Sequence, residues 1–219
     1  MDARLAFVTI GQTPRTDVVP EMTAWLGEAV EIVEYGALDG LSRIEVDALS
    51  PAGDEHRLVT RLADGSEAVV AKEAVRQRLQ ELLADMPSGA HAAVVLLCTG
   101  HLTGLRTPGL LVESQVIVDH AVSALAWGAR SLGILVPLER QMREIHFPGR
   151  EGQRLLMSHA SPYRPERLEE AARELADADL VILHCMGYTE AMRRTVATVT
   201  GRPVLLARRL VASAVAQLL

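Results

Sequence analysis

The stretch AAVVLLCTGH at residues 92–101 is a continuous apolar run that ends in a Cys-x-Gly pattern around Cys98. A second stretch, DLVILHCMGY at residues 179–188, is built in the same way around Cys185. Short apolar runs of this kind are typical of strands that are covered on both faces of a parallel sheet. The repetition predicts two related halves, each with one cysteine at the carboxyl end of a buried parallel strand.

Other parts of the chain extend this pattern. Apolar runs at 5–10, 30–33, 132–136 and 204–206 predict further strands, and residues 5–15 resemble residues 132–143 more weakly, in the same order as the cysteine motifs. Helical spacing of apolar residues recurs between most of these runs, at 75, 79, 82 and 83, at 116, 122 and 125, and at 168, 171, 172 and 175. Alternating strands and helices predict an α/β fold with mainly parallel sheets. We expect two pseudo-symmetric Rossmann-like halves with a cleft between them.

Two segments interrupt the alternation. Residues 56–71 form two short runs around Asp64-Gly65, a strong turn pair, and predict a β-hairpin inserted in the first half, over a site or at a dimer contact. Prolines and glycines at 147–165 predict a linker. The expected domains are 1–126, with the C-terminal helix as a candidate to complete it, and 127–219.

Composition limits the function classes. The chain has 219 residues and a formal net charge of −6, which argues against a nucleic-acid or anionic-membrane surface because both need clustered Lys and Arg. The apolar runs are far shorter than the roughly 20 residues that span a bilayer, and no export signal is visible. Two cysteines do not make a disulfide scaffold, so we expect a soluble cytoplasmic protein with free thiols.

The two cysteines suit a specific chemistry. Ligands of open parallel sheets bind beyond the carboxyl ends of the strands, and a pseudo-twofold would turn Cys98 and Cys185 toward one cleft. One thiolate could then remove the α-proton of a carbon acid while the opposite thiol returns a proton to the other face, with the sulfurs on the order of 7 Å apart. Backbone N–H groups after each cysteine could bind a carboxylate and lower the thiol pKa values.

Several residues near the strand ends are candidates for holding a substrate carboxylate. Arg15 follows the first strand and could form a bidentate bond, although surface use is nearly as well supported. The full set of substrate-binding candidates is Thr9, Gly11, Gln12, Arg15, Thr99, Gly100, Gly187 and Tyr188. His101 is a candidate partner of Cys98, and His184 is interpreted as a packed strand residue. The arginines at 106, 130, 193–194 and 208–209 are interpreted mainly as solvated faces or as surface that pairs with carboxylates.

Two other interpretations stay open. Free cysteines are often small buried hydrophobes without a chemical role. Cys98, His101, His184 and Cys185 are also zinc-type ligands, but adjacent strand residues point to opposite faces, which opposes shared ligation by His184 and Cys185. No glycine-rich dinucleotide or phosphate loop follows the first strand, so we expect neither a cofactor nor a metal.

Longer motifs give a resemblance. The segments at 8–20 (VTIGQTPRTDVVP), 36–42 (GALDGLS), 97–100 (LCTG), 134–139 (ILVPLE) and 179–188 resemble the AroM family in order along nearly the whole chain. That family is similar to the aspartate/glutamate racemase superfamily, whose members have two α/β halves, no cofactor and a catalytic cysteine from each half. The resemblance implies catalytic roles for Cys98 and Cys185. Racemases typically continue Cys-Asn-Thr after the first cysteine, whereas this chain has Thr99 and Gly100, so the residues that hold the substrate differ.

Together these observations favour a cofactor-independent racemase, epimerase or isomerase that acts on a small carboxylate or amino acid through two cysteines. A single-cysteine nucleophilic isomerase or hydrolase is the first alternative. A non-catalytic metabolite-binding protein on the same scaffold is the second. A homodimer is left open.

Overall fold

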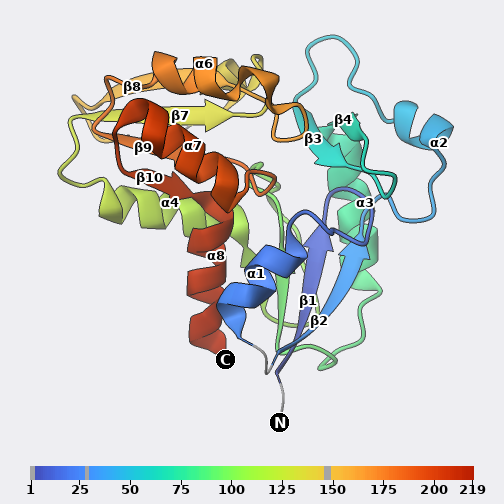
Figure 1. Ribbon diagram of the computed structural model, residues 1–219. Coiled ribbons are helices and arrows are strands. Elements are labelled where there is room, and N and C mark those ends of the chain that lie inside the picture. The colour runs from blue at the N-terminus through green and yellow to red at the C-terminus, as the bar shows by residue number, and fades with distance from the viewer. Residues whose placement is uncertain (1–2, 28–29, 146–148) are drawn as a thin grey trace. The chain divides into compact units, whose positions relative to one another are not determined.

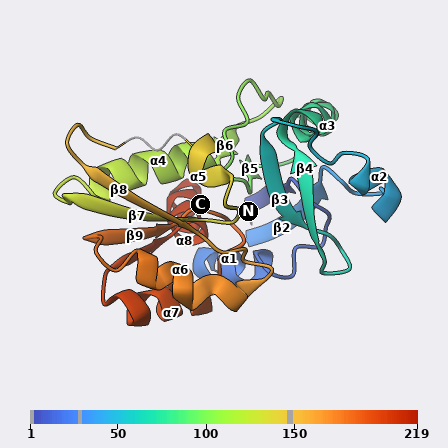
Figure 2. The ribbon, with the colours of Figure 1, turned by 90° about the horizontal axis from the view of Figure 1, so that it is seen from above.

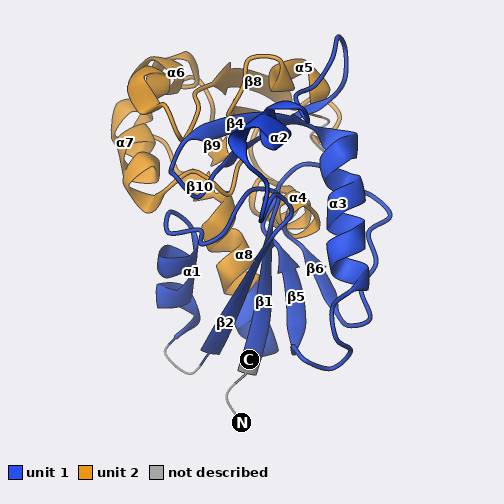
Figure 3. Cartoon of the chain, turned by 90° about the vertical axis from the view of Figure 1, so that its right-hand side faces the viewer, with its two compact units in different colours: residues 1–114, 215–219 blue, residues 115–214 orange. Residues whose placement is uncertain are grey.

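The computed structural model describes residues 3–27, 30–145 and 149–219 (Figure 1). The chain divides into two compact units, unit 1 with residues 1–114 and 215–219 and unit 2 with residues 115–214 (Figure 3). The change of unit falls at the start of helix α4 (Ser114–Leu125), whereas the boundary expected after residue 126 lies just past the end of that helix.

Each unit contains a four-stranded parallel sheet. In unit 1 the order is β2-β1-β5-β6, with β1 (Ala3–Thr9), β2 (Val30–Gly36), β5 (Ala93–Leu96) and β6 (Leu111–Glu113). In unit 2 the order is β10-β9-β7-β8, with β7 (Ser131–Val136), β8 (Arg154–His159), β9 (Leu180–Leu183) and β10 (Val204–Leu206). In both sheets the first strand lies between the second and the third, and the fourth lies outside the third. The predicted α/β fold with two pseudo-symmetric halves is confirmed, and each cysteine follows the third strand of its unit.

The six predicted strands are all present, and two edge strands were missed. The linker expected at 147–165 is wrong in its middle part, because β8 occupies Arg154–His159 and pairs with β7. This strand is exposed at its start and carries Arg, Ser and His, so it lacks the continuous apolar run of an inner strand. Residues 147 and 148 of that segment lie outside the described residues.

The longer helices are α1 (Val19–Leu26), α3 (Lys72–Ala84), α4, α6 (Leu168–Glu174), α7 (Glu190–Thr200) and α8 (Ala207–Val215). In unit 2, α4 covers one face of the sheet and α6 and α7 cover the other (Figure 2). The helices predicted from periodicity are confirmed, but α4 buries Val118 and Val122 and leaves Val116 and Leu125 exposed. No helix among the described residues is long and apolar enough to cross a membrane.

The predicted hairpin is confirmed. Strands β3 (Arg57–Arg61) and β4 (Glu67–Ala71) pair antiparallel, and Gly65 takes a φ of +88° in the turn that joins them. The hairpin lies beyond the carboxyl ends of β1 and β2 (Figures 1 and 2). It runs directly into α3, so its position is tied to that helix.

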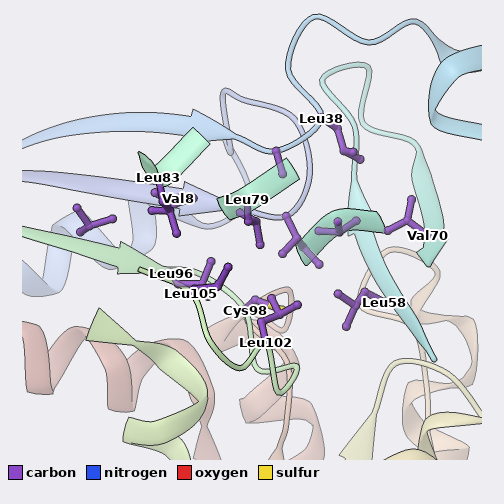
Figure 4. Close-up of a cluster of buried hydrophobic side chains, with 14 of the residues drawn as sticks. Val8, Leu38, Leu58, Val70, Leu79, Leu83, Leu96, Cys98, Leu102 and Leu105 are labelled. Atoms are coloured by element: carbon purple, nitrogen blue, oxygen red, sulfur yellow. The ribbon is translucent and has the colours of Figure 1, made fainter. Parts of the chain in front are cut away.

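The core of unit 1 joins the sheet, α3 and the hairpin. Alternate residues of the inner strands, among them Val8 of β1 and Leu96 of β5, cluster with Leu79 of α3 and Leu58 of the hairpin. Cys98 lies at the edge of this cluster, beside Leu102 (Figure 4). The apolar side chains that stabilise the unit therefore reach the first cysteine.

Candidate functional site

Cys98 follows β5 and is largely buried. Its side chain is 7% exposed, and Leu58 and Leu102 belong to the same apolar cluster. The sulfur accepts a hydrogen bond from the Gly100 N–H at 3.3 Å. A backbone N–H directed at sulfur favours the thiolate, whereas apolar surroundings favour the neutral thiol.

Cys185 follows β9 in the same manner. Its sulfur accepts a hydrogen bond from the Gly187 N–H, also at 3.3 Å, so the two Cys-x-Gly turns have the same local geometry. Cys185 is half-buried, in contrast to Cys98. The two Cys-x-Gly motifs therefore give both sulfurs the same backbone hydrogen bond, but Cys98 is more deeply buried than Cys185.

The glycine of each turn is required by what lies over it. A β-carbon at Gly100 would lie 2.6 Å from Leu58 Cδ2, and one at Gly187 would lie 2.7 Å from Pro162 Cγ and 2.9 Å from Tyr163 Oη. An added methyl group would therefore overlap a neighbour in both places. A leucine covers the first turn, and a proline and a phenol cover the second.

Tyr163 is a candidate that sequence reasoning missed. It follows β8, the edge strand that was interpreted as part of a linker, and its N–H donates to Ser161 Oγ at 3.1 Å. Recognition of β8 would have placed Tyr163 at the carboxyl end of a parallel strand, where ligands bind in such sheets.

Arg208 was interpreted as surface, and that is wrong. Its side chain is wholly buried, and Nε and Nη2 both donate to the Met186 carbonyl, at 2.9 and 2.7 Å. The guanidinium holds the residue between Cys185 and Gly187. No pattern within α8 marks this arginine, because its partner lies 22 residues away in the chain.

The end of β1 and the loop that follows it carry four predicted site residues, and several of their polar groups bond to one another. Thr9 Oγ1 accepts from the Gly11 N–H at 3.2 Å and from Arg15 Nη1 at 2.5 Å. Arg15 is 3% exposed and donates Nε and Nη2 to the two oxygens of Asp17, at 2.8 and 2.9 Å. The bidentate carboxylate bond expected of Arg15 is thus made within the chain. Burial alone raises the pKa of Asp17, but the hydrogen bonds and charge of Arg15 outweigh it and lower that pKa below its usual value.

Gln12 ties this loop to the hairpin. Its Nε2 donates to the carbonyls of Leu38 and Leu41, at 3.1 and 2.8 Å, and its Oε1 accepts from the Ala63 N–H at 3.0 Å. Its backbone N–H donates to the Arg61 carbonyl at 3.3 Å. The side-chain amide thereby fixes the hairpin over the end of β1.

The remaining candidates differ in exposure. Thr99 is buried beside Cys98, and His101 is exposed. Tyr188 is wholly buried, and its hydroxyl donates to the Ala160 carbonyl at 2.7 Å. Burial, with smaller contributions from Cys185 and Tyr163, raises the pKa of Tyr188 well above its usual value. Its phenol therefore stays neutral and keeps donating to that carbonyl.

The histidine and metal interpretations can be compared with the structure. His184 is buried, and its Nε2 lies 3.3 Å from Gln115 Nε2. Within the described ranges, no three His, Cys, Asp or Glu side chains are grouped as a metal site would require. The zinc alternative therefore gains no support.

A depression of about 570 Å³ lies beside α1. Arg15, Thr16 and Glu34 line it together with apolar residues of the helix. It includes one predicted substrate-binding residue, Arg15, and neither of the predicted catalytic cysteines.

Comparison with known proteins identifies the family. The family model described as AroM protein matches residues 5–219. The chain belongs to the AroM family. No curated protein matches this AroM family member.

Solved structures share the fold of this AroM family member at low identity. Aspartate racemase of Picrophilus torridus is 11% identical, with a TM-score of 0.62 over 98% of this chain and 93% of that one. Maleate cis-trans isomerase of Nocardia farcinica is 15% identical, with a TM-score of 0.59 over 99% and 92% of the two chains. Arylmalonate decarboxylase is also 15% identical, with a TM-score of 0.55 over 99% and 92%. These likenesses show the racemase-like scaffold. The expectation that the two sulfurs share one cleft stays a prediction.

Proposed function

We propose that the chain is a cofactor-independent racemase, epimerase or isomerase that acts on a small carboxylate or amino acid, with Cys98 and Cys185 as its reacting groups. The observation that carries the proposal is the identical N–H···S hydrogen bond of the two Cys-x-Gly turns, each after the third strand of its unit. Two thiols in equivalent turns suit a base and an acid for one carbon centre.

The roles follow from the surroundings of each sulfur. Cys98 is buried among apolar side chains, whereas Cys185 is more exposed and so more accessible to a substrate. In one direction the Cys185 thiolate takes the α-proton, and the Cys98 thiol then gives its own proton to the carbanion. The reverse direction exchanges the roles. Groups whose surroundings differ in this way are suited to separate acid and base roles.

Solvent exchange at Cα tests this proposal. The protein is incubated in deuterium oxide with single enantiomers of amino acids and small 2-substituted carboxylates, and deuterium at Cα is measured by mass spectrometry. We expect incorporation with the substrate, and we expect Cys98→Ser and Cys185→Ser each to abolish racemisation. Racemisation that persists in both variants would reject a role for the thiols as acid and base.

The unequal burial of the two thiols favours a second candidate function, nucleophilic catalysis by Cys185 alone. A Cys-to-Ser variant of the Nocardia farcinica isomerase is described with a covalently bound succinylcysteine intermediate. Under this alternative, a substrate adduct forms on Cys185 and is trapped in Cys98→Ser. Intact-protein mass spectrometry during turnover distinguishes the two, because the acid–base mechanism forms no adduct.

Binding without turnover is the third possible outcome. Thermal-shift screening of amino acids and dicarboxylates would identify ligands that stabilise the protein. A stabilising ligand that neither exchanges its α-proton nor forms an adduct would assign the protein to metabolite binding.

A further inference from the structure

The phenol of Tyr163 lies over the turn that holds Cys185. A β-carbon at Gly187 would stand 2.9 Å from Tyr163 Oη and 3.1 Å from its Cζ, so the hydroxyl occupies the space that a side chain at Gly187 would fill. The same glycine donates its N–H to the Cys185 sulfur at 3.3 Å. One residue therefore contacts both the reactive thiol and the phenol.

The position of Tyr163 is fixed from two sides. Its own N–H donates to Ser161 Oγ at 3.1 Å. The neighbouring Ala160 accepts from the Tyr188 hydroxyl at 2.7 Å, and Tyr188 follows Gly187 directly. The loop after β8 and the turn after β9 are thus joined by a buried hydrogen bond, which fixes the loop that carries Tyr163 against the Cys185 turn.

The two phenols near this turn differ in exposure. Tyr188 is wholly buried with its hydroxyl bonded to a backbone carbonyl, whereas the Tyr163 side chain is half-buried. The contributions of both Cys185 and Tyr163 to the raised pKa of Tyr188 agree with the closeness of the three groups.

The equivalent place in unit 1 is covered by a hydrocarbon side chain. There Gly100 is covered by Leu58, whose Cδ2 would lie 2.6 Å from an added β-carbon. The two turns share their backbone geometry and differ in their cover. A hydroxyl group covers the turn of Cys185 and a hydrocarbon covers the turn of Cys98, so the two turns present different chemistry to a ligand.

We propose that the Tyr163 hydroxyl donates a hydrogen bond to the carboxylate or enolate oxygen of the substrate that reacts at Cys185. This inference rests on the proposed function and adds to it a binding residue that the family motifs do not contain. A phenol that donates to an anionic oxygen stabilises it in a partly desolvated site, where such a bond is stronger than in water.

The test compares two alkylating reagents of nearly equal size and different charge. Iodoacetate carries a carboxylate, and iodoacetamide is neutral. Their rates of reaction with Cys185 in the full-length protein are measured at pH 8 by peptide mass spectrometry, with Cys98 as an internal reference. A donor for carboxylate raises the ratio of the iodoacetate rate to the iodoacetamide rate. A purely structural role of Tyr163 would change both rates alike.

We expect Tyr163→Phe to lower this ratio at Cys185 by about tenfold, the effect of one hydrogen bond to a charged group. Tyr35→Phe is the matched control, because the Tyr35 hydroxyl contacts His91 Nε2 at 3.1 Å in unit 1. Gly187→Ala is a second variant, which keeps the phenol and displaces it, and it should lower the ratio as well.

An unchanged ratio in Tyr163→Phe would overturn the proposal. Failure of both reagents to modify Cys185 in the unaltered protein would also overturn it, because an anion could then not reach this thiol. The assay needs no turnover, so a negative deuterium experiment and a negative alkylation experiment reject different claims.

Discussion

Cys98 and Cys185 accept the same backbone hydrogen bond and are covered by different side chains. Two buried arginines also determine the local structure around the candidate site. Arg15 is held by Asp17, and Arg208 by the Met186 carbonyl. Both guanidinium groups are buried, and each fixes a loop that follows an inner strand. The two buried guanidinium groups therefore fix the loops at the strand ends where the candidate site residues lie.

The Arg15–Asp17 pair makes a stability prediction. Asp17→Asn leaves a buried guanidinium without its carboxylate, and we expect a loss of about 3 kcal/mol in the free energy of unfolding at pH 7, measured by urea denaturation. Because the folded pKa of Asp17 lies below its unfolded value, its contribution is present above the unfolded pKa and is lost as pH falls through the folded one. The difference between the two proteins should therefore shrink below about pH 4.

A matched control separates burial from charge. Asp47 pairs with Arg43 at 2.8 Å, but both side chains are more than half exposed. Asp47→Asn should leave the free energy of unfolding nearly unchanged, as is usual for surface pairs. Equal losses in the two variants would contradict the role assigned to the buried pair.

Among the elements, the hairpin is the addition that distinguishes unit 1 from unit 2. Its Leu58 lies over Gly100, and Thr60, on the same face of β3, lies over Gly11. A β-carbon at Gly11 would stand 2.3 Å from Thr60 Oγ1. The hairpin thus closes directly on the backbone at the ends of β1 and β5, and glycine at both positions permits the close approach.

Thr60, in strand β3 of the hairpin, gives a prediction about stability. Its hydroxyl is buried, and it forms no hydrogen bond with any residue that the structure describes. Thr60→Val keeps the shape and removes this unsatisfied group, so we expect a gain of about 1 kcal/mol. For a chain of this length that gain raises Tm by about 2–4 °C, which differential scanning calorimetry would detect.

Thr200→Val is the control for this substitution. The Thr200 hydroxyl is also buried, but it donates to the Val196 carbonyl at 2.7 Å. The same change there removes a hydrogen bond and should give no gain in Tm. A gain of equal size in both variants would mean that valine stabilises for another reason.

In the whole molecule, the chain passes twice between the two units. The chain leaves unit 1 after residue 114 and returns to it with residues 215–219, which begin at the last residue of α8. Val215, at the junction, is wholly buried. Unfolding of α8 would withdraw the last residues from unit 1, so the units should lose their structure together.

One cysteine in each unit reports on this coupling. We expect Cys98 and Cys185 to become reactive toward iodoacetamide, beyond their native rates, at the same urea concentration. Peptide mass spectrometry at increasing urea concentrations measures both thiols in one sample. Well separated midpoints would show that the units unfold independently.

Local sequence was sufficient for the repeated architecture. Inner strands such as β5 and β9 are covered on both faces, so their residues must be apolar on both. This requirement produces a continuous apolar run that can be recognised in the sequence. The hairpin could also be predicted from the sequence, because Asp64-Gly65 specifies its turn. Edge strand β8 left no such run, since it is partly exposed and partly polar.

The tertiary structure alone decided which groups the polar side chains contact. Asp17 takes the bidentate bond expected for a ligand at Arg15, Met186 holds Arg208, and Tyr163 lies over Gly187. The last two contacts join segments more than 20 residues apart, and hydrophobic periodicity carries no information about which polar groups such segments bring together. Strand positions follow from the solvent preference of each residue, whereas the composition of the site depends on which loops meet.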